Sequence, residues 1–151
     1  MKKFYSEIRV IYADTDAMGV AYHTNYIRWF EIGRTEFLRQ IGYPYSELER
    51  PSREDEPDRT PIWLPLHTIE CTYKSPAVYD DVVEIAAWPH SMSFATVTIH
   101  YEISRKGTGD LLAIGRSVHA ITDDRLRPIR LYKVNPGLYE ATMALIEENE
   151  E

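Results

Sequence analysis

The sequence predicts an α+β protein in which an antiparallel sheet curls around one long, buried helix. Three observations support this fold class. A strand-like segment precedes an apolar helical segment that runs to about Ile41. Beyond the polar stretch that follows, the hydrophobic periodicity changes to two and stays there to about Thr122, as is typical of strands. Strands that follow one another, rather than alternating with helices, favour an antiparallel sheet over a parallel one.

The composition is that of a globular protein. The chain has 151 residues, of which 44% are hydrophobic and 27% are charged. We therefore predict one domain over residues 1–151, with a core large enough to fold without disulfides. Its one cysteine, Cys71, leaves no intrachain disulfide, and no segment resembles a signal sequence or a membrane span, so we expect a cytoplasmic protein. The net charge of -7 argues against general affinity for nucleic acid or anionic membranes.

The first predicted elements are a strand and the start of the helix. Apolar and charged residues alternate over residues 7–12, which predicts a strand. An acidic turn at Gly19 follows. Thr24 and Asn25 are residue types that cap helices by accepting hydrogen bonds from free backbone N–H groups, so the helix should begin near residues 23–26.

The predicted helix is unusually apolar and should be wrapped by other elements. One face is formed by Tyr26, Phe30, Gly33, Phe37 and Ile41. A glycine inside a helix lowers helix stability by roughly 1 kcal/mol relative to alanine. Gly33 therefore favours a close backbone approach from the neighbouring sheet at this position, with a tolerated surface glycine as the alternative. Gly42 and Pro44 should end the helix.

The remaining chain is predicted to be mainly strands. Residues 45–61 are polar, acidic and contain three prolines, which predicts a long exposed loop. Alternation then predicts strands at residues 69–73, 82–88, 94–103 and 111–122. Residues 106–109 should form a hairpin turn. A last helix is predicted over residues 136–146, with Asn135 as its cap.

Two aspartates lie between the first strand and the helix. A carboxylate close to the partly positive start of a helix can act as base or nucleophile on a carbonyl group, while backbone N–H groups stabilise the oxyanion. We expect Asp14 to bond its own turn, as such side chains commonly do. Asp16 lies nearer to the helix start, and is the better candidate for chemistry.

Two other functions would use the same aspartates. An EF-hand loop starting at Asp14 would put Met18 and Asn25 at ligand positions, which excludes it. A magnesium-dependent phosphatase would use Asp14 as nucleophile and Asp16 as acid, with residues 123–124 holding the metal. That fold needs helices alternating with parallel strands, for which the middle of the chain has no room, so it is the less favoured alternative.

Basic residues gather in the last third of the chain. Residues 105–133 hold seven Lys and Arg against three Asp, a local balance of +4. Such a segment can receive a phosphorylated ligand, whereas a solvated face is the alternative for most of its residues. The histidines outside the acidic turn match no standard zinc spacing, so no metal or cofactor is predicted.

Two stretches carry a recognisable pattern. The first is Tyr12-x-Asp14-Thr15-Asp16-x-x-Gly19-Val20-x-Tyr22-His23-x-Asn25-Tyr26, with Phe30, Glu31 and Arg34 in the following helix. The second is Tyr73-Lys74-Ser75-Pro76-Ala77-Val78-Tyr79-Asp80-Asp81. Together they resemble the 4-hydroxybenzoyl-CoA thioesterase family of hot-dog proteins, whose sheet wraps around one helix. The resemblance covers roughly residues 4–130.

This resemblance implies a function and a site. The activity would be hydrolysis of an acyl-CoA or acyl-carrier-protein thioester without a cofactor. Asp16 would be the catalytic base or nucleophile, and the backbone N–H of His23 would polarise the carbonyl. Some relatives are thought to use a tyrosine and a histidine at the positions of Tyr12 and His23, so both side chains are further candidates. The sites would lie between the subunits of a homodimer, which in many relatives pairs into a homotetramer.

For a CoA substrate, the basic segment supplies the candidate phosphate contacts. These are Lys106, Arg125, Arg127 and Arg130. A hot-dog dimer that binds acyl carriers or partner proteins without turnover is the remaining alternative.

Overall fold

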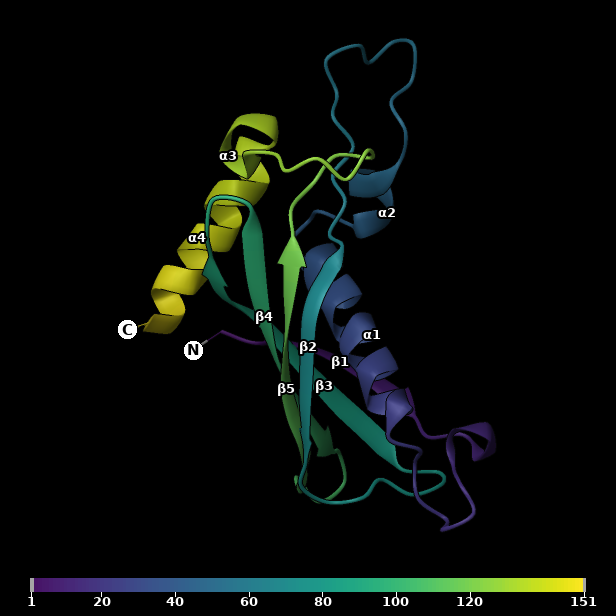
Figure 1. Ribbon diagram of the computed structural model, residues 1–151. Helices are drawn as coiled ribbons and strands as arrows, with labels where there is room; N and C mark the ends of the chain where they lie inside the picture. The colour runs from purple at the N-terminus through teal and green to yellow at the C-terminus, as the bar shows by residue number, and fades with distance from the viewer. Residues whose placement is uncertain (1, 151) are drawn as a thin grey trace.

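A computed structural model describes residues 2–150 as a five-stranded antiparallel sheet with a long helix along it (Figure 1). The strand order is β1-β3-β4-β5-β2, so β1 and β2 form the two edges. The strands are β1 (Phe4–Arg9), β2 (Leu66–Tyr73), β3 (Val82–Met92), β4 (Thr96–Arg105) and β5 (Leu111–Ala120). The helices are α1 (Thr24–Gln40), α2 (Tyr45–Glu49), α3 (Leu131–Val134) and α4 (Pro136–Glu150), besides a 3-10 turn at Tyr12–Asp14. The predicted fold class is confirmed.

Helix α1 packs closely on the inner face of the sheet. A Cβ atom on Gly33 would lie 2.6 Å from Cγ2 of Ile85 in β3, so the sheet does approach the helix closely here, but through side chains of β3 rather than through its backbone as predicted. Phe30 stacks on Tyr101 of β4 with 4.5 Å between ring centroids. Its ring also fills the hollow above Gly115 of β5. These contacts bury the apolar face that the helical spacing predicted.

The first strand ends earlier than predicted. β1 stops at Arg9, and Tyr12 lies in the 3-10 turn with 78% of its surface exposed. The cause is Asp14, whose Oδ2 accepts a hydrogen bond from the Ile11 N–H at 3.0 Å and draws the chain into a turn. Alternation of residue types does not reveal this local hydrogen bond.

The predicted helix caps are wrong, although the helix begins where expected. Thr24 and Asn25 lie inside the first turn of α1, and no side chain caps the helix at His23. Asn25 instead donates its side-chain amide to the carbonyl oxygen of Asp14 at 2.7 Å. The residue therefore ties the helix start to the preceding acidic turn. At the other end, α1 stops before Gly42 as predicted, and Gly42 has a φ of +90°.

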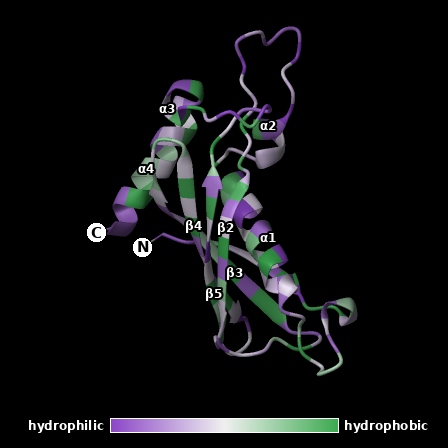
Figure 2. Ribbon diagram, in the orientation of Figure 1, coloured by the Kyte–Doolittle hydropathy of each residue, from purple (hydrophilic) through white to green (hydrophobic). Residues whose placement is uncertain are grey.

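Residues 45–61 are more ordered than the predicted loop. Helix α2 occupies the first five of them. Beyond it, both terminal nitrogens of Arg50 donate to the Glu56 carboxylate, at 2.8 and 2.7 Å, and Arg50 Nε donates to Glu47. These ion pairs hold the base of a loop that is coloured mainly hydrophilic in Figure 2.

The later strands and helices differ from the prediction mainly at their ends. β3 continues through Pro89 to Met92, because a register shift between Pro89 and Ser91 accommodates the proline in the ladder with β4. The hairpin turn at 106–109 lies between β4 and β5 as predicted. Asn135 caps α4 by accepting the Leu138 N–H at 3.1 Å. The sequence did not reveal α3. Between residues 2 and 150, no helix combines the length and the apolar composition that crossing a membrane requires.

A chain of hydrogen-bonded side chains crosses the core between β4 and β5. Tyr101 Oη lies 2.6 Å from Ser117 Oγ, which lies 2.8 Å from His119 Nε2. His119 Nδ1 lies 3.0 Å from the Leu64 carbonyl oxygen. A carbonyl only accepts, so Nδ1 carries the proton, Ser117 donates to Nε2, and Tyr101 donates to Ser117. Burial, aided by the charge of Arg34, lowers the pKa of His119 to about 4, so its imidazole is neutral.

Acidification is expected to destabilise the protein through His119. The folded-state pKa of about 4 lies below the usual 6.5, so the unfolded state binds more protons between these values and stability falls as the pH falls through this window. Between pH 7 and pH 5 the loss in unfolding free energy should be about 2 kcal/mol. Urea unfolding at both pH values measures it. His119→Gln should remove most of the difference, whereas exposed His67→Gln should retain it. Equal pH dependence in His119→Gln and the parent would contradict this assignment.

Candidate active site

Asp14 holds the acidic turn to the start of α1. The residue is only 6% exposed, and its Oδ1 accepts a hydrogen bond from Arg28 at 2.6 Å, while Oδ2 accepts the Ile11 N–H. Its carbonyl oxygen accepts from the Tyr22 N–H and from the Asn25 side chain. Both carboxylate oxygens are therefore engaged, as the prediction of a turn-forming role requires.

Asp16 begins a tight loop and keeps one carboxylate oxygen free. The loop is closed by a hydrogen bond from the Asp16 N–H to the Val20 carbonyl at 2.9 Å, and its Gly19 has a φ of +81°, which favours glycine. Asp16 Oδ1 accepts the Met18 N–H at 2.8 Å, which fixes the side chain. Across residues 2–150, no protein donor bonds Oδ2. This oxygen is available to take a proton or to attack a carbonyl carbon.

The start of α1 offers backbone donors beside this loop. The Tyr73 hydroxyl donates to the His23 carbonyl at 2.9 Å and so fixes where the helix begins. Within the described chain, no acceptor is found for the His23 N–H. The first N–H groups of any helix lack intrahelical partners and carry partial positive charge, which suits them to an oxyanion. The exposed His23 imidazole lies 4.3 Å from the Tyr22 ring between centroids.

Asp16 and His23 line one open pocket of about 320 Å³. The pocket lies between the start of α1 and the chain that leaves β2. Tyr26 and Tyr73 are on its wall. Burial and the neighbouring Cys71 raise the pKa of Tyr73 to about 12, so the Tyr73 hydroxyl remains protonated and can donate a hydrogen bond at neutral pH. The pocket thus joins an acceptor carboxylate to hydrogen-bond donors.

Tyr12 is not part of this pocket. Its ring packs edge-on against Tyr79 with 5.8 Å between centroids, and residues lining the pocket do not include it. The sequence also did not single out Tyr73 for the site. The one indication in the sequence was that Tyr73 is the first residue of the second motif stretch. The sequence did not show how the strands pair, and it is this pairing that brings the end of β2 to the start of α1.

The four predicted CoA contacts divide between the two ends of the sheet. Lys106 follows β4 and pairs its ammonium group with Glu7. Arg125, Arg127 and Arg130 follow β5 at the end away from the Asp16 loop (Figure 1). Arg127 pairs with Asp123 at 3.0 Å, whereas Arg125 and Arg130 have no carboxylate within 4.0 Å among residues 2–150. One chain alone therefore does not assemble the four residues into one site.

The structure contradicts the phosphatase alternative, because the aspartates that it needs lie far apart. Asp123 and Asp16 lie beyond opposite ends of β5, whose ten residues span roughly 33 Å. The Asp123 carboxylate is also occupied by the N–H groups of Arg125 and Arg127 and by the Arg127 side chain. The sheet is antiparallel, and the described residues contain no cluster of three or more His, Cys, Asp or Glu suited to a metal ion.

The fold and the pocket define a hot-dog protein with a carboxylate at the start of its central helix, and known proteins share this architecture. Residues 10–142 match the thioesterase-like superfamily. YneP of Bacillus subtilis, provisionally named an acyl-CoA thioesterase, is 30% identical over 136 residues, 89% of this chain and 91% of YneP. The acyl-CoA thioesterase YbgC of Haemophilus influenzae is 28% identical over 102 residues, 68% and 69% of the two chains.

Solved structures of other proteins share the fold of this chain. The crystal structure of a DHNA-CoA thioesterase from Staphylococcus aureus has a TM-score of 0.87 at 29% identity, covering 99% of this chain and 95% of that one. A hypothetical protein from Thermus thermophilus has a TM-score of 0.80, also at 29% identity, covering 94% and 98%. The chain belongs to the thioesterase-like superfamily.

Proposed function

We propose that this protein is an acyl-CoA thioesterase, located in the cytoplasm, whose reaction takes place at the Asp16 pocket. The observation that carries this proposal is a carboxylate with one fixed oxygen and one free oxygen, beside the unbonded N–H groups at the start of α1. Its similarity to relatives named acyl-CoA thioesterases supports acyl-CoA as the substrate class.

Two routes fit this geometry. As a base, Asp16 takes a proton from water, and the hydroxide adds to the thioester carbonyl carbon. As a nucleophile, Asp16 adds to that carbon itself, and water later hydrolyses the mixed anhydride. In both routes negative charge develops on the carbonyl oxygen, where the His23 N–H stabilises it. The C–S bond then breaks and CoA leaves as its thiolate. A chemical role for the Tyr12 side chain would need a different arrangement from the one described.

Assembly into a dimer would bring the basic segment 123–130 of one copy close to the Asp16 pocket of the other. β2 is an edge strand whose outer backbone groups need a partner, and pairing with a second copy is a common solution. β2 runs from the end that holds segment 123–130 to the Asp16 pocket. In an antiparallel β2–β2 pair about a two-fold axis, segment 123–130 of one copy lies at the end that carries Asp16 of the other.

We expect the protein to elute as a homodimer or homotetramer. Light scattering coupled to size-exclusion chromatography measures this, and a monomer has a mass of 17.6 kDa. A proline at Ile69 of β2, whose N–H points away from β5, should weaken the assembly, because proline removes a donor from the outer edge of the strand. A fully active 17.6 kDa monomer would exclude a site shared between subunits.

Arg125 and Arg130 are expected to contact CoA phosphates. Their double alanine variant should raise KM on the order of tenfold and leave kcat nearly unchanged, because such contacts exist in both ground state and transition state. Rising salt should reproduce the effect in the parent. Arg39→Ala is the matched control, since Arg39 is exposed and already pairs with Glu36. Lys106 should contribute less, because Glu7 neutralises it. An unchanged KM would place the nucleotide elsewhere.

A panel hydrolysis assay tests the proposed function. Aromatic, short, medium and long acyl-CoA thioesters, together with an acyl-carrier-protein thioester, are compared by release of free thiol. We expect turnover of at least one, unaffected by EDTA. Tight binding without turnover of any of them would favour the non-catalytic alternative.

A further inference from the structure

Arg34 differs from the other partly buried arginines in its lack of a carboxylate partner. Arg50, Arg59 and Arg105 each lie within 4.0 Å of a Glu or Asp oxygen. No such oxygen lies that close to Arg34 anywhere in residues 2–150. Its polar neighbours are uncharged: Nη1 lies 3.4 Å from His119 Nε2, and the guanidinium group also interacts with the Tyr101 hydroxyl. Because His119 is neutral and its Nε2 already accepts the Ser117 hydroxyl, this contact does not balance the charge of Arg34.

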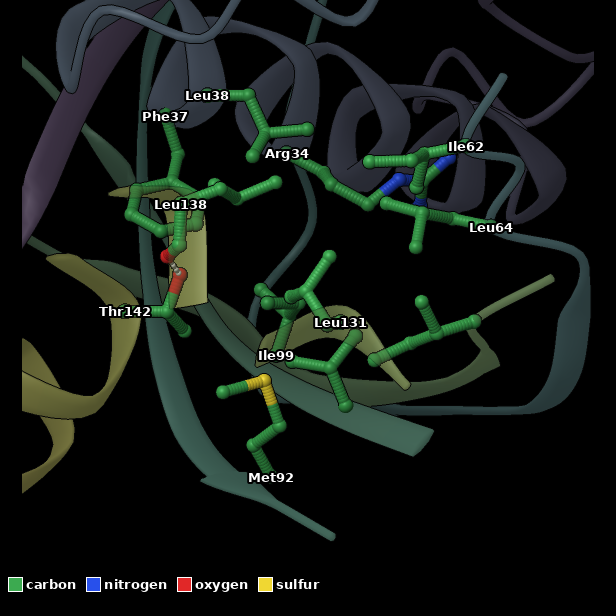
Figure 3. A pocket seen from close by; sticks show the side chains of 12 residues that line it. Arg34, Phe37, Leu38, Ile62, Leu64, Met92, Ile99, Leu131, Leu138 and Thr142 are labelled. Carbon is green, nitrogen blue, oxygen red and sulfur yellow. Dashed lines mark hydrogen bonds between the residues drawn. The ribbon is translucent and has the colours of Figure 1, made fainter. Parts of the chain in front are cut away.

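The Arg34 side chain reaches into a narrow cavity at the far half of α1 (Figure 3). The guanidinium group lies towards the chain that precedes β2, next to Ile62 and Leu64. Apart from Thr142, whose hydroxyl donates to the Leu138 carbonyl, the other walls are apolar side chains, among them Phe37, Ile121 and Leu131. The cavity volume of about 30 Å³ corresponds to about two water molecules. This is the size of a carboxylate group.

We infer that this cavity binds the head group of an apolar monocarboxylate, with its two oxygens on the Arg34 guanidinium. The planar fork of a guanidinium matches the two oxygens of a carboxylate. A cation held against apolar walls is costly when unpaired, and a ligand anion relieves that cost. The apolar walls favour a hydrocarbon chain beside the head group and disfavour the hydrated charges of a phosphate ester.

This site is separate from the Asp16 pocket of the same chain. Arg34 follows His23 by 11 residues, which is roughly 16 Å along a helix. The inferred ligand belongs to the same chemical class as the acid that a thioesterase releases. The inference itself does not require the proposed function, since direct binding tests it without turnover.

Hexanoate is a suitable probe, and hexanamide is its uncharged counterpart. Calorimetry should show one hexanoate site per chain, and backbone amide signals of Ile62, Leu64 and Ile121 should shift in an NMR titration. Hexanamide should bind at least about tenfold more weakly, because it cannot form a charge-assisted pair.

Arg34→Gln is expected to weaken hexanoate binding at least about tenfold. Arg39→Gln is the matched control, since Arg39 lies on the same helix, is exposed and pairs with Glu36. Arg34→Lys keeps the charge without the fork and should bind with intermediate affinity. Equal affinity of Arg34→Gln and the parent, equal affinity for hexanoate and hexanamide, or no shift near Ile62 would each overturn the inference. If Arg34→Gln does not fold, the acid and amide comparison in the parent decides alone.

Discussion

Replacing Asp16 with asparagine is expected to lower kcat by at least about a hundredfold, the usual scale for loss of a catalytic acid or base. The amide keeps the shape of the carboxylate, and its oxygen can still accept the Met18 N–H that fixes the loop. The substitution replaces only Oδ2, the oxygen that no protein group occupies, with an amide nitrogen that cannot act as a base or nucleophile. Circular dichroism and the melting temperature should remain close to those of the parent, and the assay uses the best thioester from the panel.

Asp14→Asn is the matched control, two residues away in the same turn. Both oxygens of Asp14 accept hydrogen bonds, one of them from Arg28, and the residue is buried. Its replacement should therefore lower the unfolding free energy by about 1 to 3 kcal/mol, with a smaller effect on turnover per folded molecule. A folded Asp16→Asn protein that hydrolyses its best substrate at the parental rate would refute the proposed mechanism.

Gly115→Ala is expected to lower the unfolding free energy by at least about 3 kcal/mol, at the upper end of overpacking effects. An added Cβ would lie 2.4 Å from the Glu70 carbonyl oxygen and 2.4 Å from the Phe30 ring. The carbonyl belongs to the paired strand β2, and the ring is stacked on Tyr101, so neither can yield without breaking other contacts. Urea unfolding measures the loss.

Gly107→Ala provides the comparison. Gly107 lies in the hairpin turn between β4 and β5, has no positive φ, and a Cβ there meets no atom within 4 Å. Its replacement should change stability by no more than about 0.5 kcal/mol. If both variants unfold at the same urea concentration, the tight packing described between Phe30 of α1 and Gly115 of β5 would be contradicted.

The main elements were predictable because they repeat a simple pattern. Helical spacing identified the buried face of α1, and Gly33 predicted a close approach of the sheet, which the Ile85 side chain makes rather than the backbone of β3. Element ends were less predictable. β1 ends at Arg9 because one carboxylate, that of Asp14, captures the Ile11 N–H. Individual side-chain hydrogen bonds of this kind leave no trace in residue alternation.

The candidate site was only partly predictable for a related reason. Asp16 and His23 lie in one short stretch, and their shared pocket follows from local turn and helix geometry. Tyr73 reaches the same pocket from 50 residues away, which depends on how β2 pairs with β5. The buried chain from Tyr101 to His119 similarly requires the register between β4 and β5. Sequence spacing alone contains neither relation.

The position of α1 in the chain has a consequence for biosynthesis. α1 ends at Gln40, but the strands that cover its apolar face are not complete until Ala120 of β5. Ribosomes add roughly 5 to 20 residues per second, so the helix waits on the order of 4 to 16 s for its covering sheet. During that interval a nascent chain exposes Trp29, Phe30 and Phe37. We therefore expect the same buried helix that organises the finished fold to be the segment most prone to aggregation during synthesis.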